Sequence, residues 1–228
     1  MRVDGILFDK DGTLFDFTAT WSAWAGSLIG RLSDGDPASA TRIAGEMGYD
    51  LAARRFDPAS PAIAGTPDEL ATRLAPILDM PAPRVAAMLN AEAMAVPLAE
   101  AVPLAPLLDG LIGRGLVLGV ATNDAEAPAR AHLAQAGVAD RFAFVAGYDS
   151  GHGAKPAPGQ CLAFARAVGL VPERVAMVGD SRHDLIAGRA AGMRTVAVLT
   201  GPARADTLRP LADAVLPDIG HLPDLLAR

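Results

Sequence analysis

Short apolar runs that alternate with helix-like segments constrain the fold of this chain more than any other feature. Each run is rich in β-branched residues and ends at polar residues or glycine, which predicts a buried strand. The predicted strands are Val3–Phe8, Leu116–Ala121, Phe142–Ala146, Arg174–Val178 and Arg194–Leu199, with a weaker edge strand at Ala214–Leu216. Helical spacing is found between them, at Leu104–Arg114, Ala125–Ala136, Pro158–Val168 and Asp184–Ala191. Strands and helices in this order predict βαβ units and a doubly wound, mainly parallel sheet of the α/β class.

A stretch of roughly 80 residues interrupts that alternation after the first strand. It is rich in alanine and has helix-like segments at Thr18–Leu32, Ala38–Arg55, Pro67–Leu78 and Arg84–Ala95. Thr66 before Pro67, with Glu69 three residues later, matches a capping box at a helix start. We therefore expect an all-helical domain, residues 17–96, inserted into a sheet core made of residues 1–16 and 97–228.

Polar side chains gather where the predicted strands end. In a doubly wound sheet, the carboxyl ends of the parallel strands meet at one edge, and ligands bind there. The residues at these ends are Asp9 and Asp11 after the first strand, Thr122 and Asn123 after the second, Lys155 after the third, and Asp180 and Asp184 after the fourth. We therefore expect these seven side chains to converge.

The residue types in this set favour chemistry on a phosphoryl group. If strand geometry continues, Asp9 and Asp11 face one side and Lys10 the other. Paired carboxylates repel each other unless a cation or proton separates them, and with Asp180 they form an oxygen ligand set suited to Mg²⁺. Lys155 and the Thr122 hydroxyl offer a positive charge and a donor to an anion. Carboxylates that hold Mg²⁺ beside an anion site are what phosphoryl transfer requires.

Composition excludes several other classes. The formal net charge is −6, which argues against nucleic acid or an anionic membrane as the main partner. A single cysteine cannot form an internal disulfide. The charged residues among the first eleven do not fit a signal peptide, and no apolar run reaches about 18 residues. The expected location is the cytoplasm.

Four segments together resemble the motifs of the haloacid dehalogenase-like hydrolase superfamily. They are Phe8-Asp9-Lys10-Asp11-Gly12-Thr13-Leu14, Thr122-Asn123, Lys155-Pro156, and Gly179-Asp180-Ser181-Arg182-His183-Asp184, in the order the family has them. The helical insertion after the first motif resembles the cap of the phosphoglycolate phosphatase-like and β-phosphoglucomutase-like branch. The resemblance implies a Rossmann-like core, and four matching segments in this order argue against an interpretation of them as unrelated turns.

The resemblance also implies a role for each site residue. Asp9 would attack phosphorus to give an aspartyl-phosphate, and Asp11 would protonate the leaving alkoxide and then activate water. Thr122, Asn123 and Lys155 would bind the phosphoryl oxygens. Mg²⁺ would be held by the Asp9 and Asp180 carboxylates and the Asp11 carbonyl, with Asp184 orienting a ligand water. Keeping Asp11 protonated at pH 7 costs about 4 kcal/mol, which repulsion from Asp9 and burial would have to supply.

These features predict a Mg²⁺-dependent phosphatase that acts on a small phosphorylated metabolite, of the phosphoglycolate or sugar phosphate type. The acid at Asp11 argues against a dehalogenase, because a halide leaves without being protonated. Two alternatives remain open: a phosphosugar mutase of the same superfamily, and a non-catalytic domain that only accepts a phosphoryl group on aspartate.

Several residues outside the motifs have simpler expected roles. Trp21 and Trp24 are expected to pack in the core of the insertion, and Arg54 and Arg55 to be solvated. His132 and His221 are expected at the surface. His183 and His152 lie within or beside motifs, and either could touch the substrate.

Overall fold

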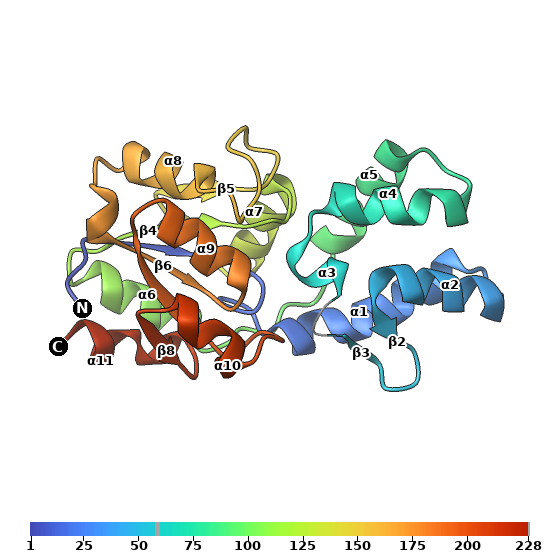
Figure 1. The fold of residues 1–228 in the computed structure, drawn as a ribbon, viewed down its shortest axis with the longest axis horizontal. Coiled ribbons are helices and arrows are strands. Elements are labelled where there is room, and N and C mark those ends of the chain that lie inside the picture. Colours follow the sequence, from blue (N-terminus) through green and yellow to red (C-terminus); the bar gives the residue numbers. More distant parts are fainter. Residues whose placement is uncertain (58–59, 228) are drawn as a thin grey trace.

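A sheet of six parallel strands, in the order β5-β4-β1-β6-β7-β8, forms the centre of the larger body of the molecule (Figure 1). The computed structural model describes residues 1–57 and 60–227. The strands are β1 (Gly5–Phe8), β4 (Val117–Ala121), β5 (Phe144–Ala146), β6 (Val175–Gly179), β7 (Arg194–Val198) and β8 (Ala214–Leu216). Every pairing between them is parallel. The predicted α/β, Rossmann-like parallel fold is confirmed, including the edge strand.

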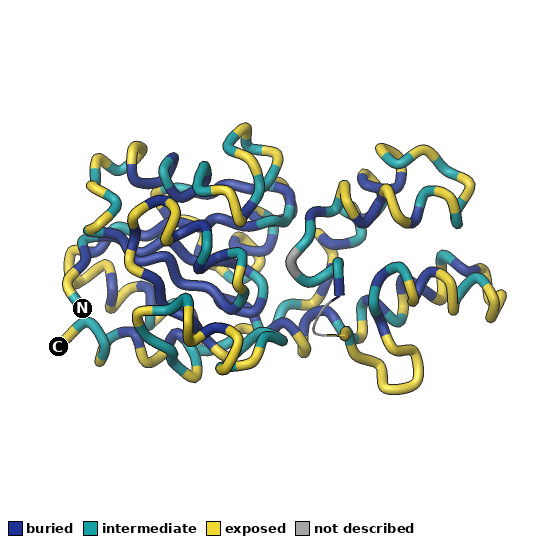
Figure 2. Tube along the Cα trace, in the orientation of Figure 1, coloured by how far each residue is buried: buried dark blue, intermediate teal, exposed yellow. Residues whose placement is uncertain are grey.

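Helices cover both faces of this sheet. They are α6 (Leu104–Ile112), α7 (Glu126–Gln135), α8 (Gly159–Ala167), α9 (Arg182–Ala190), α10 (Ala205–Leu208) and α11 (Leu222–Leu226), with short 3₁₀ helices at Ala139–Arg141, Pro172–Arg174, Arg209–Leu211 and Ile219–His221. Because side chains alternate along a strand, Ile6 and Phe8 of β1 pack in the cluster that contains α6, α7 and α11 residues. Leu7 packs on the other face with α8 and α9 residues. The centre of the sheet is therefore covered on both faces: Figure 2 shows β1, β4, β6 and β7 mostly buried, whereas the edge strand β8 is half-buried.

The strand order places the end of β1 at the point where the chain changes direction across the sheet. From β1 the chain passes to β4 and β5 on one side, and then returns to β6, β7 and β8 on the other. The loops after β4 and β6 therefore lie on either side of the loop after β1. Such a switch point leaves a crevice at the carboxyl ends of the strands.

The segment between β1 and α6 is mostly helical and packs around its own hydrophobic cluster. Its elements are α1 (Phe17–Leu32), α2 (Pro37–Met47), β2 (Tyr49–Asp50), β3 (Arg55–Phe56), α3 (Pro61–Ala64), α4 (Pro67–Leu78) and α5 (Ala82–Met94). Leu28, Ile43, Leu74 and Val85 are buried in that cluster, one from each of the four long helices. The predicted capping box of Thr66 and Glu69 is present at the start of α4. We refer to residues 17–96 as the insertion.

The structure corrects the predicted helix Ala38–Arg55. Helix α2 ends at Met47, because Gly48 adopts a left-handed conformation with φ of 63° and terminates it. The chain then forms the two-stranded antiparallel ribbon of β2 and β3, in which Tyr49 pairs with Phe56. The ring of Tyr49 packs edge-on against Phe56, and its hydroxyl donates to the Ser22 carbonyl, 2.8 Å away on α1. Contact with α1 thus stabilises a ribbon where alanine content alone suggested helix.

None of the helices in residues 1–57 and 60–227 has the length and hydrophobicity that crossing a bilayer requires.

Candidate active site

One pocket lies between the carboxyl ends of the strands and the insertion, and all seven predicted site residues line it. They are Asp9, Asp11, Thr122, Asn123, Lys155, Asp180 and Asp184. The loops after β1, β4, β5 and β6 supply all of them except Asp184, which lies in the first turn of α9. The opposite side of the pocket is formed by residues of the insertion, among them Trp21 and Phe56. The convergence predicted from the strand ends is therefore present.

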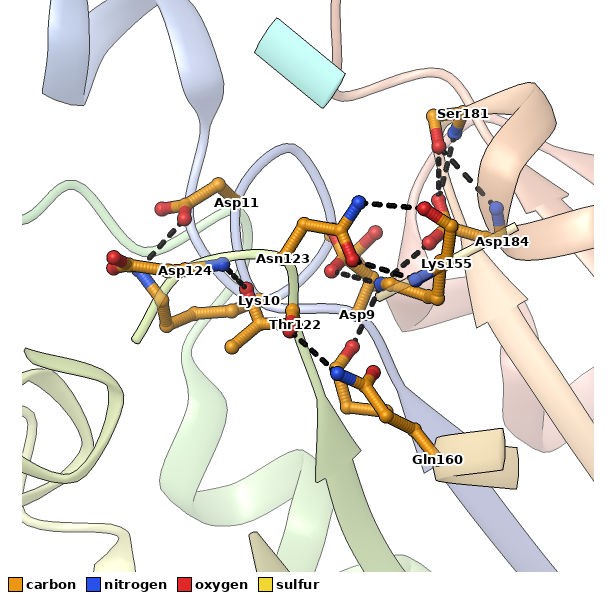
Figure 3. A network of polar contacts seen from close by, with 12 residues as sticks. Asp9, Lys10, Asp11, Thr122, Asn123, Asp124, Lys155, Gln160, Ser181 and Asp184 are labelled. Carbon is orange, nitrogen blue, oxygen red and sulfur yellow. Dashed lines mark hydrogen bonds and ion pairs between the residues drawn. The ribbon is translucent and has the colours of Figure 1, made fainter. Parts of the chain in front are cut away.

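The ammonium group of Lys155 joins two of the acids. Lys155 Nζ lies 2.6 Å from Asp9 Oδ1 and 2.6 Å from Asp184 Oδ1, and it donates to the Ala121 carbonyl at 2.7 Å (Figure 3). Burial opposes the charged ammonium, but Asp184 and Asp9 together outweigh burial and raise the pKa of Lys155. Lys155 is therefore a fixed positive charge beside Asp9.

Three buried carboxylates meet at this point and could hold a metal ion. One oxygen from each of Asp9, Asp180 and Asp184 lies within 4.8 Å of the others. Burial raises the pKa of Asp9 to about 7, although Lys155 acts against it. Burial, reinforced by the charges of Asp9 and Asp184, raises the pKa of Asp180 well above its usual range. One ammonium cannot balance three carboxylates, and the all-oxygen set fits a hard divalent cation.

Glycines allow the backbone to approach the Asp180 carboxyl group closely. Gly12 has a φ of 82°, and a Cβ at that position would lie 2.5 Å from the Asp180 carboxyl group. A Cβ on Gly201 would lie 1.7 Å from Asp180 Oδ2. Side chains at either position would displace this carboxylate, so the loops are shaped around it.

Asp184 serves a structural purpose as well as contacting Lys155. Its Oδ2 accepts hydrogen bonds from the backbone N–H of Ser181 at 2.9 Å and from the Ser181 hydroxyl at 2.7 Å. The bond from the Ser181 backbone N–H, together with the bond that the Asp184 backbone N–H donates to the Ser181 hydroxyl at 3.4 Å, forms a capping box at the start of α9. The helix end therefore holds the Asp184 carboxylate in place while its other oxygen faces Lys155.

Thr122 and Asn123 hold the loops around the pocket together. The amide of Asn123 donates to the Lys155 carbonyl and accepts from the Lys155 backbone N–H, both at 2.8 Å. The Thr122 hydroxyl accepts from the Asp124 backbone N–H at 3.0 Å. Gln160 donates to the Thr122 carbonyl at 3.0 Å, a contact that the sequence motifs did not reveal. Asn123 thus positions Lys155, and the binding of phosphate by Thr122 and Asn123 stays a prediction.

Asp11 lies in a different set of contacts from Asp9, although both line the pocket (Figure 3). Lys10 Nζ is 2.6 Å from Asp11 Oδ2, and the Trp21 indole donates to Asp11 Oδ1 at 2.9 Å. Burial acts to raise the pKa of Asp11, as expected, but the charge and hydrogen bond of Lys10, with smaller contributions from His132 and Trp21, together outweigh burial and lower the pKa. The surroundings of Asp11 therefore favour its ionised form, whereas the sequence predicted that burial and repulsion from Asp9 would keep it protonated.

The prediction that Lys10 faces away from the acids was wrong. Strand β1 ends at Phe8, and the Leu14 backbone N–H donates to the Lys10 carbonyl at 2.9 Å, which closes a turn. Alternation of side chains therefore stops before Lys10, and its ammonium group reaches Asp11 on the same side.

His132 is also buried, contrary to its predicted place at the surface. Its Nδ1 lies 2.9 Å from Lys10 Nζ, and its Nε2 lies 2.8 Å from the Ala93 carbonyl of α5. Asp124 completes the surroundings of Lys10, 3.1 Å from Nζ. A sequence signal for this burial existed: His132 shares one helical face with Ala129 and Leu133, which are both buried. His221 is exposed, as predicted, and His183 lines the pocket.

Both tryptophans pack in the insertion, as predicted, but they are not confined to its core. Their rings pack edge to face with centroids 5.0 Å apart, and both also line the pocket. Arg54 and Arg55 are exposed, as expected.

Comparison with known proteins gives, for most of the chain, the same family that the sequence motifs resemble. The family model described as haloacid dehalogenase-like hydrolase matches residues 3–192. A phosphoglycolate phosphatase of Rhodospirillum rubrum is 33% identical over 227 residues, covering 97% of this chain and 90% of that protein. A phosphoglycolate phosphatase of Neisseria meningitidis is 41% identical over 113 residues, 49% of this chain and 48% of that protein.

A solved structure shares the fold over nearly the whole chain. The crystal structure of a predicted phosphoglycolate phosphatase from Haemophilus somnus superposes with a TM-score of 0.72 at 19% identity, covering 99% of this chain and 98% of that one. The motifs, the parallel sheet and these relatives agree. The chain belongs to the haloacid dehalogenase-like hydrolase family and is a phosphatase of its phosphoglycolate phosphatase-like branch.

Proposed function

We propose that the chain is a Mg²⁺-dependent phosphatase that hydrolyses a small phosphorylated metabolite, of the phosphoglycolate or sugar phosphate type, through an aspartyl-phosphate on Asp9. The observation that carries this proposal is the position of Asp9, which lies 2.6 Å from Lys155 and within a cluster of three buried carboxylates. The full-length relative from Rhodospirillum rubrum supports the substrate class.

In the first half of the reaction, a carboxylate oxygen of Asp9 forms a bond to phosphorus while the bond from phosphorus to the leaving oxygen breaks. Lys155 favours the ionised, nucleophilic form of Asp9, since the two groups form a direct ion pair. Lys155 neutralises negative charge on the phosphoryl oxygens, and the Thr122 hydroxyl donates a hydrogen bond to one of them. In the second half, water attacks the phosphorus of the aspartyl-phosphate, which releases phosphate and restores the Asp9 carboxylate.

Asp11 is placed to transfer the protons in both halves. While bonded to Lys10 and Trp21, it favours the ionised state, which suits a base that takes a proton from water. To protonate the leaving alkoxide it must first gain a proton, and its contact with Lys10 must weaken when substrate occupies the pocket. Binding of substrate against Trp21, which lines the same pocket, gives a route to that change.

The carboxylates fit Mg²⁺, and Asp9, Asp180 and the Asp11 carbonyl would hold it, with Asp184 orienting a ligand water. When bound, the ion would neutralise charge on the phosphoryl group. Asp180 would remain fixed by the close approach of Gly12 and Gly201, and Asp184 by its bonds to Ser181.

We also propose that residues 17–96 form a cap over a catalytic core made of residues 1–16 and 97–228. Two observations support this division: the insertion has its own hydrophobic cluster, and its residues line the pocket opposite Asp9. A cap in that place would exclude bulk water while the leaving group is protonated.

Release of inorganic phosphate from a panel of phosphorylated metabolites, with Mg²⁺ or with EDTA, tests the proposal. Asp9→Asn should abolish turnover, and EDTA should do the same reversibly. Asp140→Asn is a matched control, because this carboxylate is on the surface with 84% of its side chain exposed. Undiminished activity in Asp9→Asn would overturn the role of Asp9. Phosphoryl transfer to a second sugar phosphate would indicate a mutase, and a stable phosphoprotein without turnover would indicate a phospho-acceptor domain.

A further inference from the structure

The pocket has two sides of opposite character. The core side carries the carboxylates, Lys155 and the Thr122 hydroxyl. The other side, which we call the insertion wall, consists of the pocket-lining residues between positions 17 and 93. Its largest side chains are Phe17, Trp21, Trp24, Phe56, Ile63 and Leu70. The aromatic rings meet edge to face, with centroids 5.6 Å apart for Phe17 and Phe56. A leaving group attached to a phosphate held at Asp9 would lie against this wall.

The insertion wall contains no charged side chain among the described residues that line the pocket. Arg54 and Arg55, the nearest arginines in sequence to Phe56, are exposed and do not line it. A leaving group with a carboxylate or a second phosphate would thus meet apolar surface, where an unpaired charge is strongly disfavoured.

The described part of the core side offers no unpaired lysine or arginine to a second anion. Among the described lining residues, the side chains that can carry a positive charge are Lys155 and the histidine His183. Lys155 is already bonded to Asp9, Asp184 and the Ala121 carbonyl. Five aspartates line the pocket, so a divalent ion, Lys155 and the neighbouring Lys10 do not fully balance them. A second anion on the substrate would add to an excess of negative charge.

Two neutral polar atoms of the insertion wall have no hydrogen-bond partner within the described part of the chain. They are the Trp24 indole Nε1, a donor, and the Asn90 amide Oδ1, an acceptor, and both are buried. Buried polar atoms are almost always paired in proteins. Both residues line the pocket, so a ligand bound there is a candidate partner for these atoms. A hydroxyl or amide group can donate to Asn90 and accept from Trp24, whereas a carboxylate can only accept.

We propose that the preferred substrate is a phosphate monoester whose leaving group is uncharged, has an apolar face that packs against the insertion wall, and carries a hydroxyl or amide group. This inference rests on the proposed function, because it assumes that Asp9 receives the phosphoryl group. It narrows the substrate class: phosphoglycolate, with its carboxylate, should be a poor substrate compared with uncharged esters.

Kinetics of the full chain with Mg²⁺ test the inference on matched esters. Phosphoglycolate and 2-hydroxyethyl phosphate share a skeleton and differ in the carboxylate, so their comparison isolates charge. Benzyl phosphate adds an apolar ring, and its 3-hydroxymethyl derivative adds a hydroxyl group. We expect kcat/KM to rise in that order, with at least a tenfold gap between phosphoglycolate and benzyl phosphate.

Variants of the insertion wall give a second test. Asn90→Leu should remove the advantage of the 3-hydroxymethyl derivative over benzyl phosphate. Ile63→Lys should raise kcat/KM for phosphoglycolate about tenfold and lower it for benzyl phosphate. Val171→Lys is the matched control: it adds the same charge at a surface position, 59% exposed, that does not line the pocket.

The outcomes separate this inference from the proposed function. Acetyl phosphate is small and needs no protonation of its leaving group, so its hydrolysis, lost in Asp9→Asn, reports the chemistry alone. If acetyl phosphate is hydrolysed but phosphoglycolate matches or exceeds the uncharged esters, the substrate inference is wrong. If His183→Ala then removes that turnover of phosphoglycolate selectively, His183 supplies the positive charge that binds the carboxylate. If not even acetyl phosphate is hydrolysed, the proposed function fails, and the substrate inference with it.

Discussion

The indole N–H of Trp21 donates a 2.9 Å hydrogen bond to Asp11 Oδ1. Trp21 belongs to α1 of the insertion, whereas Asp11 follows the first strand of the sheet. The other oxygen of Asp11 contacts Lys10, which also lies 5.5 Å from the centroid of the Trp21 ring. The insertion and the core thus meet on the carboxyl group proposed to transfer protons, and the first two predictions follow from that contact.

Replacing Asp11 by asparagine removes the proton donor and base while keeping the size of the side chain. We expect substrate binding to be retained and kcat to fall by about 10²–10⁴-fold. With acetyl phosphate, the variant should accumulate phosphoprotein, since Asp9 can still be phosphorylated but water is no longer activated. Turnover close to wild type would exclude the role of Asp11.

Trp21→Phe keeps an aromatic ring in the pocket but removes the hydrogen bond to Asp11. We expect kcat for benzyl phosphate to fall by about tenfold, because roughly one charge-assisted hydrogen bond to Asp11 is lost. The change in KM should be smaller. For p-nitrophenyl phosphate, whose leaving group needs no proton, the loss should be smaller. Trp24→Phe serves for comparison, because no contact joins that indole to Asp11. Equal losses with both esters would assign Trp21 to packing alone.

Lys10 is fully buried and serves three partners at once: Asp11, Asp124 and His132. Lys10→Met would leave two acids without their counter-charge, so the free energy of unfolding should drop by about 3–5 kcal/mol. Urea denaturation measures this change. Arg31→Met, which breaks an ion pair with Glu92 at the surface, should alter the unfolding midpoint little. If the two variants are equally stable, the network around Lys10 does not stabilise the fold.

Mg²⁺ should stabilise the protein more at neutral than at acidic pH. The pKa of Asp9 is raised from 3.8 to about 7, so without an ion the folded chain binds more protons than the unfolded chain between these values. The stronger proton binding at Asp9 stabilises the folded state, and this stabilisation is fully present below pH 3.8 and is lost as the pH rises toward 7. Mg²⁺ would bind the ionised carboxylate of Asp9, so at low pH it has to displace the proton there. The rise in Tm on adding Mg²⁺ should therefore be larger at pH 7.5 than at pH 5, and small in Asp180→Asn. An equal rise at both pH values would contradict the assigned ligands.

Alanine substitutions at Gly12 and Gly35 distinguish the effect of backbone strain from the effect of crowding at the Asp180 carboxyl group. Both glycines have positive φ, 82° and 77°. A Cβ on Gly12 would lie 2.5 Å from the Asp180 carboxyl group, whereas one on Gly35 would meet nothing within 4 Å. Either alanine variant should lose about 1 kcal/mol of stability from the strained backbone. Only Gly12→Ala should also weaken Mg²⁺ binding and lower kcat, by more than about tenfold. Mg²⁺ titration of activity distinguishes the two.

Local patterns in the sequence determined the sheet and the place of the site. Apolar runs and helical spacing predicted each strand of the sheet and the four helices between them, because burial on two faces requires continuous apolar residues. Parallel connections bring carboxyl ends to one edge, so residues as distant as Asp9 and Asp180 could be assigned to one pocket. The capping box at Thr66 was equally local, since its bonds join residues three apart.

Tertiary structure alone decided how the side chains in that pocket pair with one another. Lys10 turns toward Asp11 because the strand ends before it and the insertion covers it, and neither fact is local to the motif. His132 is buried because Lys10 and the end of α5 supply its partners, and Asn123 is held by the backbone of Lys155. The charge balance of the pocket and the apolar character of its insertion wall follow from these contacts. Periodicity predicts which element a residue occupies, but the distances between elements set which charges neutralise each other.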